Sequence, residues 1–195
     1  MKNIGLTGGI GSGKSTISKI FISKGIPVYD SDSKAKFLMN SSIELKNNII
    51  KKFGNESYKN NKLNRKYLAN IVFNDRLKMM KINSLVHPYV YKDYNDWKRG
   101  IFSKYVIFES ALIFETGSYK NNDFNILVVS DIDKRIKRIK NRDKLSKKDI
   151  IKRIRNQWSD DKKISLCDYI IKNNSLTNTK EKVIKMIEYL DEKFK

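Results

Sequence analysis

Gly8-Gly9-Ile10-Gly11-Ser12-Gly13-Lys14-Ser15 is the stretch of sequence that decides the fold. It fits the pattern G-x-x-x-x-G-K-S/T, a glycine-rich turn whose backbone N–H groups surround a phosphate group. The apolar run Ile4 to Leu6 precedes it, and apolar residues at helical spacing follow from about Ser15. A strand before the glycines and a helix after them is the context in which this motif binds phosphate. A glycine-rich turn without a ligand is the alternative, but such turns seldom carry Lys-Ser where the helix starts.

Residues Gly8 to Ser15, the phosphate loop, predict a site for ATP and Mg²⁺. Glycines let the backbone approach an anion closely. Lys14 can reach the β- and γ-phosphates, and the Ser15 hydroxyl can ligate the Mg²⁺ that bridges them. Thr16 is expected to support the α-phosphate. The predicted nucleotide site consists of Gly8, Gly9, Gly11, Ser12, Gly13, Lys14, Ser15 and Thr16.

Four further apolar runs are candidate parallel strands because each is short, β-branched or aromatic, and bounded by polar residues. They are Ile26 to Tyr29, Tyr105 to Phe108, Ile126 to Val129 and Tyr169 to Ile171. Gly25 suits the C-terminal cap of the first helix. Strands that alternate with helices predict an α/β, three-layer P-loop NTPase fold with a five-stranded parallel sheet. Ligands bind such sheets beyond the carboxyl ends of the strands.

Residues 33–102, between the second and third predicted strands, are expected to form an all-helical insertion. Apolar residues recur there at helical spacing, as at Ile49, Ile50, Phe53, Leu68, Val72 and Phe73. Residues 133–158 are helical in pattern but very basic, and they are a candidate helical lid. The α/β core is then expected to comprise residues 1–32, 103–132 and 159–195.

The composition narrows the class of protein. With 39% hydrophobic and 32% charged residues, the chain has enough apolar material for a folded core. No apolar run approaches the roughly 18 residues that span a bilayer, and Met1 to Leu6 is too short for a signal peptide. The single Cys167 cannot form an internal disulfide. These features predict a cytoplasmic protein without a membrane partner.

The net charge of +20 raises the question of a nucleic-acid partner. However, the basic residues are interleaved with Asn and Ile along the whole chain, and no compact basic tail stands apart. This distribution favours compositional drift together with a site for polyanionic small molecules. We therefore expect no specific nucleic acid, and we expect a monomer.

Two carboxylates, Asp30 and Asp32, follow the second predicted strand. At least one of them should stand at the carboxyl edge of the sheet, near the phosphate loop. A carboxylate within hydrogen-bond reach of an acceptor hydroxyl can orient it and take its proton. The alternative is that Ser31 or Asp32 only caps the helix that begins near Ser33.

Several motifs, taken in order, closely resemble the dephospho-CoA kinase family. They are Gly5 to Thr16, Asp30-Ser31-Asp32, His87-Pro88 and Leu112-Ile113-Phe114-Glu115, and the similarity continues through Arg65 to Phe73, Arg138 to Gln157 and Asp168 to Asn173. Together these motifs are far more specific than a phosphate loop alone. Ala111, where many relatives carry Pro, and Cys167, where Ala is common, depart from the pattern without removing a charged group.

The resemblance implies transfer of the ATP γ-phosphoryl group to the ribose 3′-hydroxyl of dephospho-CoA, the last step of coenzyme A biosynthesis. It implies that the second Asp of the Asp-x-Asp pair, Asp32, is the base. Asp30, at the end of the second predicted strand, is expected to lie beside the substrate, and Lys14 of the phosphate loop is the second expected catalytic residue. The resemblance also implies that Arg138 and Arg142, four residues apart and so on one helical face, contact the ATP phosphates from the lid. Their alternative is a solvated charged surface.

Three further residues are assigned by the same resemblance. Asn173 matches an asparagine near the adenine, although it could be an ordinary turn former. Arg65 and His87 lie in the insertion that would bind dephospho-CoA, and Arg65 could equally be a surface cation. His87 is the only histidine, so a metal role would leave it without partners. Glu115, or Glu109, is expected to assist Mg²⁺ or a lid arginine, with a helix cap or salt bridge as the alternative.

Two other functions compete with this one. The nearest is another nucleoside monophosphate-type kinase, because the phosphate loop, acid and lid are shared by many such enzymes. The His-Pro pair and the long insertion favour dephospho-CoA. The other is a nucleic-acid-associated P-loop ATPase, which the net charge of +20 motivates.

Overall fold

The computed structural model describes residues 1–72 and 75–195. Five parallel strands form its central sheet: β1 (Lys2–Thr7), β2 (Val28–Asp30), β5 (Tyr105–Glu109), β6 (Phe124–Val129) and β7 (Tyr169–Lys172). Their order in the sheet is β2-β5-β1-β6-β7, so the strand that leads into the phosphate loop is central. All five predicted strands and their parallel pairing are confirmed.

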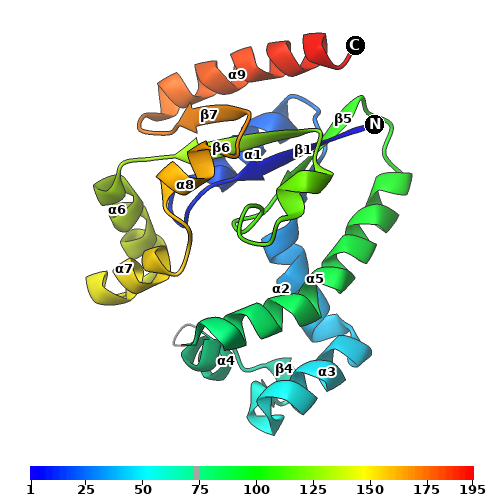
Figure 1. Cartoon of the computed structure of the whole chain (residues 1–195), viewed down its shortest axis with the longest axis vertical. Coiled ribbons are helices and arrows are strands. Elements are labelled where there is room, and N and C mark those ends of the chain that lie inside the picture. Colours follow the sequence, from blue (N-terminus) through cyan, green and yellow to red (C-terminus); the bar gives the residue numbers. More distant parts are fainter. Residues whose placement is uncertain (73–74) are drawn as a thin grey trace. The chain divides into compact units, whose positions relative to one another are not determined.

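Helices α1 (Lys14–Ser23) and α9 (Leu176–Lys193) cover one face of the sheet. From α1, Ile17 and Phe21 are fully buried, and they pack with alternate residues of the strands, such as Ile4 and Ile126. Figure 1 shows α9 lying along the sheet beside β7. Burying each such side chain contributes about 1.5–3 kcal/mol, so this apolar layer fixes where α1 begins.

The opposite face of the sheet is covered by α8 (Asp160–Ile164) and by residues 110–122, which include the short 3-10 helix Ser118–Asn121. Asn125 of β6 points to this side, where its amide donates to the Tyr119 carbonyl at 3.2 Å and its side-chain oxygen accepts from Asn122 at 2.8 Å. The sheet is therefore a middle layer, as predicted.

A helical arm follows β6. It consists of α6 (Ile132–Asp143) and α7 (Lys147–Arg155), and it extends from the carboxyl end of β6 (Figure 1). Ile139 and Ile150 are its fully buried residues, whereas most of its lysines and arginines are exposed. The helical pattern predicted for residues 133–158 is confirmed, and the role of a lid stays a prediction.

Residues Ser31–Ile101 form a second compact unit, separate from the unit of Met1–Asp30 and Phe102–Lys195. Its helices are α2 (Ser31–Ser41), α3 (Ile43–Phe53), α4 (Arg65–Val72) and α5 (Arg76–Arg99), with a 3-10 turn at Asn55–Ser57. The domain boundaries at 33 and 102, and the substrate-binding role, stay predictions. The apolar position Phe73 lies outside the described residues.

The insertion is mainly helical, but it also contains a small hairpin that the expectation of helices alone missed. Strands β3 (Tyr58–Lys59) and β4 (Lys62–Leu63) pair antiparallel. The two residues between them, Asn60 and Asn61, both have positive φ angles, 49° and 63°. Asparagine tolerates this conformation well, and two such residues make the turn that suits a two-residue hairpin. The Asn-Asn pair was the available signal.

Among the described residues, the helices include none that is both long and apolar enough to cross a bilayer. The longest, α5, has 24 residues but carries charged side chains along its length.

Gly25 lies at the C-terminal end of α1, as the sequence indicates, and it is the residue directly after the C-cap. The cap residue is Lys24, and Gly25 follows it with φ of 76°. The N–H groups of Gly25 and Ile26 donate to the carbonyls of Ile22 and Phe21 at 2.9 and 3.1 Å. This is the Schellman arrangement, which satisfies the last carbonyls of a helix.

We predict that Gly25→Ala lowers the free energy of unfolding by about 1–2 kcal/mol, because a β-carbon strains the left-handed conformation. Space is not the cause, since a methyl group at this position would meet no atom within 4 Å. Urea denaturation measures the change.

Gly100→Ala is the matched control. Gly100 also has open space around it, but its φ is −92°. There an alanine should be neutral or stabilise by about 0.4–1 kcal/mol, because it restricts the unfolded chain. Equal effects of the two substitutions would contradict the explanation by backbone conformation.

Candidate active site

The phosphate loop begins directly after the last residue of the central strand β1 and ends at Ser15, the second residue of α1. Gly13 immediately precedes α1 with φ of 95° and ψ of 29°, a left-handed conformation that favours glycine. The first turn of α1 holds no acidic residue. Because the N-terminus of a helix carries free N–H groups and partial positive charge, this end of α1 suits an anion.

The predicted nucleotide residues lie together on this turn. The Lys14 ammonium reaches back across the loop and donates to the Gly8 carbonyl at 3.1 Å. Ser15 is exposed, Thr16 is half-buried and Ser12 is buried. A lysine at the loop surface beside an exposed hydroxyl is the arrangement that phosphate and Mg²⁺ binding require.

Arg138 and Asn173 also belong to this cluster, and both hold the loop backbone. Arg138 Nη1 donates to the Gly11 and Ser12 carbonyls, each at 3.2 Å, and Nη2 donates to the Asn173 carbonyl at 2.9 Å. The Asn173 side chain donates to the same Ser12 carbonyl at 2.8 Å and accepts from Thr179 at 3.0 Å. Asn173 is therefore more than a turn former. Contacts of these residues with ATP stay predictions.

Arg142, in contrast, does not join the loop in this structure. Its side chain is 63% exposed and makes a two-bond ion pair with Asp143, at 2.6 and 2.9 Å. Hydrogen bonding to Asp143 raises the pKa of the Arg142 guanidinium. Arg142 lies four residues beyond Arg138 on α6, so a phosphate contact from it stays a prediction.

Two residues at the loop were missed by the sequence reasoning. Arg135 of α6 is 6% exposed and donates from Nε to the Ile10 carbonyl at 3.0 Å. Gln157, just beyond α7, accepts from the Ile10 N–H at 2.7 Å. The available signal for Arg135 was its position three residues before Arg138, on the same helical face. For Gln157 no signal in the sequence indicated a backbone contact.

Carboxylates stand at the same edge of the sheet as the loop. Asp30, exposed, is the last residue of β2 and is in register with Glu109, the last residue of β5. Glu109 is in turn in register with Leu6 of β1. Glu109 is 7% exposed and accepts a hydrogen bond from Ser18, one turn into α1. The sheet therefore brings Asp30 and Glu109 to the edge that carries the phosphate loop.

Asp32 and His87 lie in the second unit, as neighbours on α2 and α5. Asp32 is in the first turn of α2, where its negative charge interacts favourably with the helix dipole. Burial lowers the pKa of the half-buried His87 from its usual value, and the Asp32 charge opposes this shift. Arg65, also in this unit, is exposed at the start of α4. Substrate contacts of all three stay predictions.

Glu115 is engaged in a buried ion pair. Its Oε1 lies 2.7 Å from the Lys163 ammonium, which is fully buried, and it also accepts from the Trp158 N–H at 3.1 Å. The salt-bridge alternative for Glu115 is therefore present in the structure. The pair fastens residues just beyond the helical arm to the loop after β5, and a substrate contact of Glu115 stays a prediction.

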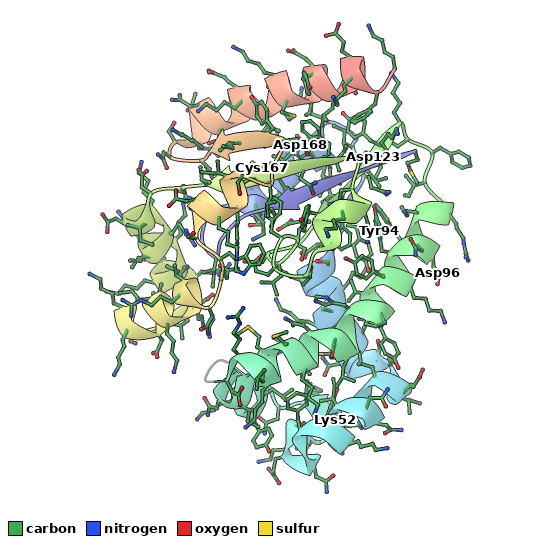
Figure 2. All side chains as sticks on the ribbon, in the orientation of Figure 1. Lys52, Tyr94, Asp96, Asp123, Cys167 and Asp168 are labelled. Atoms are coloured by element: carbon green, nitrogen blue, oxygen red, sulfur yellow. The ribbon has the colours of Figure 1, made fainter. Side chains whose placement is uncertain are left out.

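Two carboxylates at the opposite edge of the sheet, where the strands begin, accept hydrogen bonds from backbone N–H groups. Asp123, before β6, accepts from the Asn3 N–H at 2.8 Å, and Asp168, before β7, accepts from the Asn125 N–H at 2.7 Å. Figure 2 shows Cys167 and Asp168 side by side where β7 begins. Burial raises the pKa of the Cys167 thiol, which disfavours its reactive form. This edge therefore offers no catalytic group to the loop.

No group of three or more His, Cys, Asp or Glu side chains suited to a metal exists within the described parts of the chain. Mg²⁺ usually takes one or two protein oxygens and otherwise substrate phosphates and water. Ser15 lies in the first turn of α1, and Glu109 accepts a hydrogen bond from Ser18 of the same helix. Contacts of either residue with Mg²⁺ stay predictions.

The phosphate loop follows the central strand of a parallel sheet, and the basic helices α6 and α7 follow the neighbouring strand β6. This arrangement defines a P-loop kinase. The sequence profile of the dephospho-CoA kinase family matches residues 2–179. The chain therefore belongs to the dephospho-CoA kinase family, and the resemblance stated from its motifs is confirmed.

Individual relatives agree with this assignment. A dephospho-CoA kinase of Fusobacterium nucleatum is 40% identical over 88% of this chain and 89% of its own length. The crystal structure of TT1252 from Thermus thermophilus superposes with a TM-score of 0.85 at 28% identity, covering 96% of each chain. The dephospho-CoA kinase from Campylobacter jejuni gives a TM-score of 0.66 at 27% identity, with the same coverage.

We predict that Lys163→Met lowers the free energy of unfolding by about 3–5 kcal/mol, because it leaves the Glu115 charge buried without its partner. Replacing both residues, as Lys163→Met with Glu115→Leu, should cost much less. Urea denaturation of Lys163→Met, of Glu115→Leu and of the double variant measures the coupling.

The control is Lys134→Met, which breaks an exposed pair with Asp131 at 3.3 Å. It should change stability by no more than about 1 kcal/mol. Additive losses in the double variant at the Glu115 pair would contradict the ion pair as the source of stability.

A second prediction concerns His87, whose imidazole signal needs no assignment because the chain has one histidine. NMR titration should give a pKa below about 6.5, and Asp32→Asn should lower it further. The exposed Asp96→Asn should leave it unchanged. A pKa that is unmoved or raised in Asp32→Asn would contradict the proximity of the two groups.

The same shift has a consequence for stability. Since the folded state disfavours the charged imidazole, the unfolded state binds more protons, and stability rises with pH in this window. The contribution of His87 to the free energy of unfolding is therefore complete above about pH 6.5. It is lost as the pH falls from there through the lowered pKa of His87 in the folded state. His87→Gln should flatten this part of the curve.

Proposed function

We propose that this chain transfers the γ-phosphoryl group of ATP to the ribose 3′-hydroxyl of dephospho-CoA, with Asp32 as the base. Its family performs this reaction as the final step of coenzyme A biosynthesis. The observation that carries the proposal is the complete phosphate loop, whose lysine and exposed serine stand at the carboxyl edge of the central strand.

The loop binds the nucleotide through its backbone. N–H groups of the loop and of the first turn of α1 donate to the phosphate oxygens, and Lys14 adds a positive charge. Phosphoryl transfer proceeds through a loose transition state whose charge lies on the phosphoryl oxygens. Groups already in place to meet that charge need no reorganisation, so they supply most of the catalysis.

Mg²⁺ is the metal that the donor set fits. Ser15 offers a hydroxyl as a direct ligand, and Glu109 offers a carboxylate that can hold metal-bound water. When bound, Mg²⁺ neutralises charge on the β- and γ-phosphates. The remaining ligands are phosphate oxygens and water, which agrees with the small number of protein oxygens present.

The acceptor is activated by a carboxylate. Asp32 accepts a hydrogen bond from the 3′-hydroxyl and takes its proton as the new O–P bond forms. The bond between the γ-phosphorus and its bridging oxygen breaks, and ADP leaves. Asp30, at the end of β2, orients the same substrate. His87 of α5 is a neighbour of Asp32. At neutral pH it contributes an uncharged hydrogen-bond donor, because burial lowers its pKa.

A coupled assay of the purified protein with ATP and Mg²⁺ tests the function. Dephospho-CoA should be phosphorylated far better than any nucleoside monophosphate of a panel. Preference for a nucleoside monophosphate would instead indicate another kinase on the same fold. A strong rise in ATP hydrolysis on adding RNA or DNA, with steep salt dependence, would indicate a nucleic-acid-associated ATPase.

We predict that Asp32→Asn lowers turnover of dephospho-CoA by about 10²- to 10³-fold while ATP binding is retained, because only the acceptor's base is lost. Asp96→Asn, an exposed carboxylate on α5, should leave turnover unchanged. Asp30→Asn is the informative comparison: a larger loss there than in Asp32→Asn would reassign the base to Asp30.

A further inference from the structure

The carbonyl groups of the phosphate loop are held from outside, and Arg135 holds one of them without any role in the transfer described above. Its side chain is only 7% exposed, although arginine is almost never buried without a partner. Nε donates to the Ile10 carbonyl at 3.0 Å, and Nη1 pairs with Asp160 at 3.3 Å. The Asp160 carboxylate, at the start of α8, compensates the buried charge.

Holding a carbonyl also orients the next N–H group. In a trans peptide the C=O of one residue and the N–H of the next point in opposite directions. Arg135 binds the Ile10 carbonyl, so the Gly11 N–H points away from Arg135. Arg138 and Asn173 bind the Ser12 carbonyl in the same way, which orients the Gly13 N–H.

Two N–H groups of this turn are used within the protein. Ile10 donates to Gln157 at 2.7 Å, and Ser12 donates to the Gly9 carbonyl at 3.0 Å. Over residues 1–72 and 75–195, the N–H groups of Gly11 and Gly13 have no protein acceptor. Both groups are therefore available to an anion.

Gly9 and Arg135 are in close contact. A β-carbon on Gly9 would lie 2.1 Å from Nη2 and 2.7 Å from Cζ of Arg135. The absence of a side chain at Gly9 therefore serves the guanidinium as much as any phosphate. A side chain at this position would displace the guanidinium from the loop.

We infer that Arg135, braced by Asp160, is a positioning residue of the phosphate loop that orients the Gly11 N–H for the nucleotide's β-phosphate. The inference rests on nucleotide binding, which is part of the proposed function. Arg135 acts through the Ile10–Gly11 peptide and does not touch the phosphates itself. It therefore affects ATP and ADP alike, because both carry a β-phosphate.

The test is calorimetric binding of ATP and of ADP without dephospho-CoA. Arg135→Met should weaken both by about tenfold, the effect of one lost hydrogen bond to a charged group. Amide exchange of Gly11 in the free protein should become faster. Asp160→Asn, which keeps the arginine but removes its brace, should weaken both nucleotides less. Lys137→Met, an exposed residue of the same helix, should change neither.

Two outcomes overturn the inference. Unchanged affinity for both nucleotides in folded Arg135→Met would show that the loop keeps its shape without the guanidinium. Weakened binding of ATP but not of ADP would show a direct contact with the γ-phosphate. If Arg135→Met does not fold, Arg135→Lys decides by the same criteria. Lysine keeps the positive charge, but it lacks the planar guanidinium that donates to Ile10 and Asp160 at the same time.

The proposed function can fail separately. Wild-type protein that binds ADP but does not phosphorylate dephospho-CoA would refute the substrate and leave the role of Arg135 intact. Wild-type protein that phosphorylates dephospho-CoA, with Arg135→Met equal to it in binding both nucleotides, would refute the role of Arg135 alone.

Discussion

The orientation of peptide groups in the phosphate loop is the constraint on which the rest of this structure depends. A loop can bind phosphate only if its N–H groups face the anion, and each such N–H requires the carbonyl of the preceding residue to face outward. Outward carbonyls near the protein interior need donors. Arg135, Arg138, Asn173 and Lys14 supply those donors, and they come from three different places along the chain.

This requirement explains why the helical arm begins where it does. The first half of α6 is fastened to the loop by two guanidinium groups, and Gln157 fastens the far end of the arm to Ile10. The ion pair of Glu115 with Lys163 anchors the segment that follows. Of the three arginines of α6, Arg142 lies beyond this fastened base and is exposed to solvent.

Much of the fold was predictable because its signals are local. The five strands are short apolar runs, and the helix after the loop shows its period in Ile17 and Phe21. The hairpin at Asn60-Asn61 was missed because strands of two residues carry too few side chains for a pattern. Arg135 was missed because its spacing from Arg138 indicates a shared helical face but does not reveal the distant partners that allow its burial, here Ile10 and Asp160.

The sequence by itself determined the class of protein, since a phosphate loop is contiguous and its residue types follow from how a backbone must bend around an anion. It also determined the family, through motifs placed in order along the chain. Only the tertiary structure decided which arginines donate to the loop and which are exposed to solvent. Arg135, Arg138 and Arg142 share one helix and one residue type, and they differ only in what the fold places within reach of their guanidinium groups.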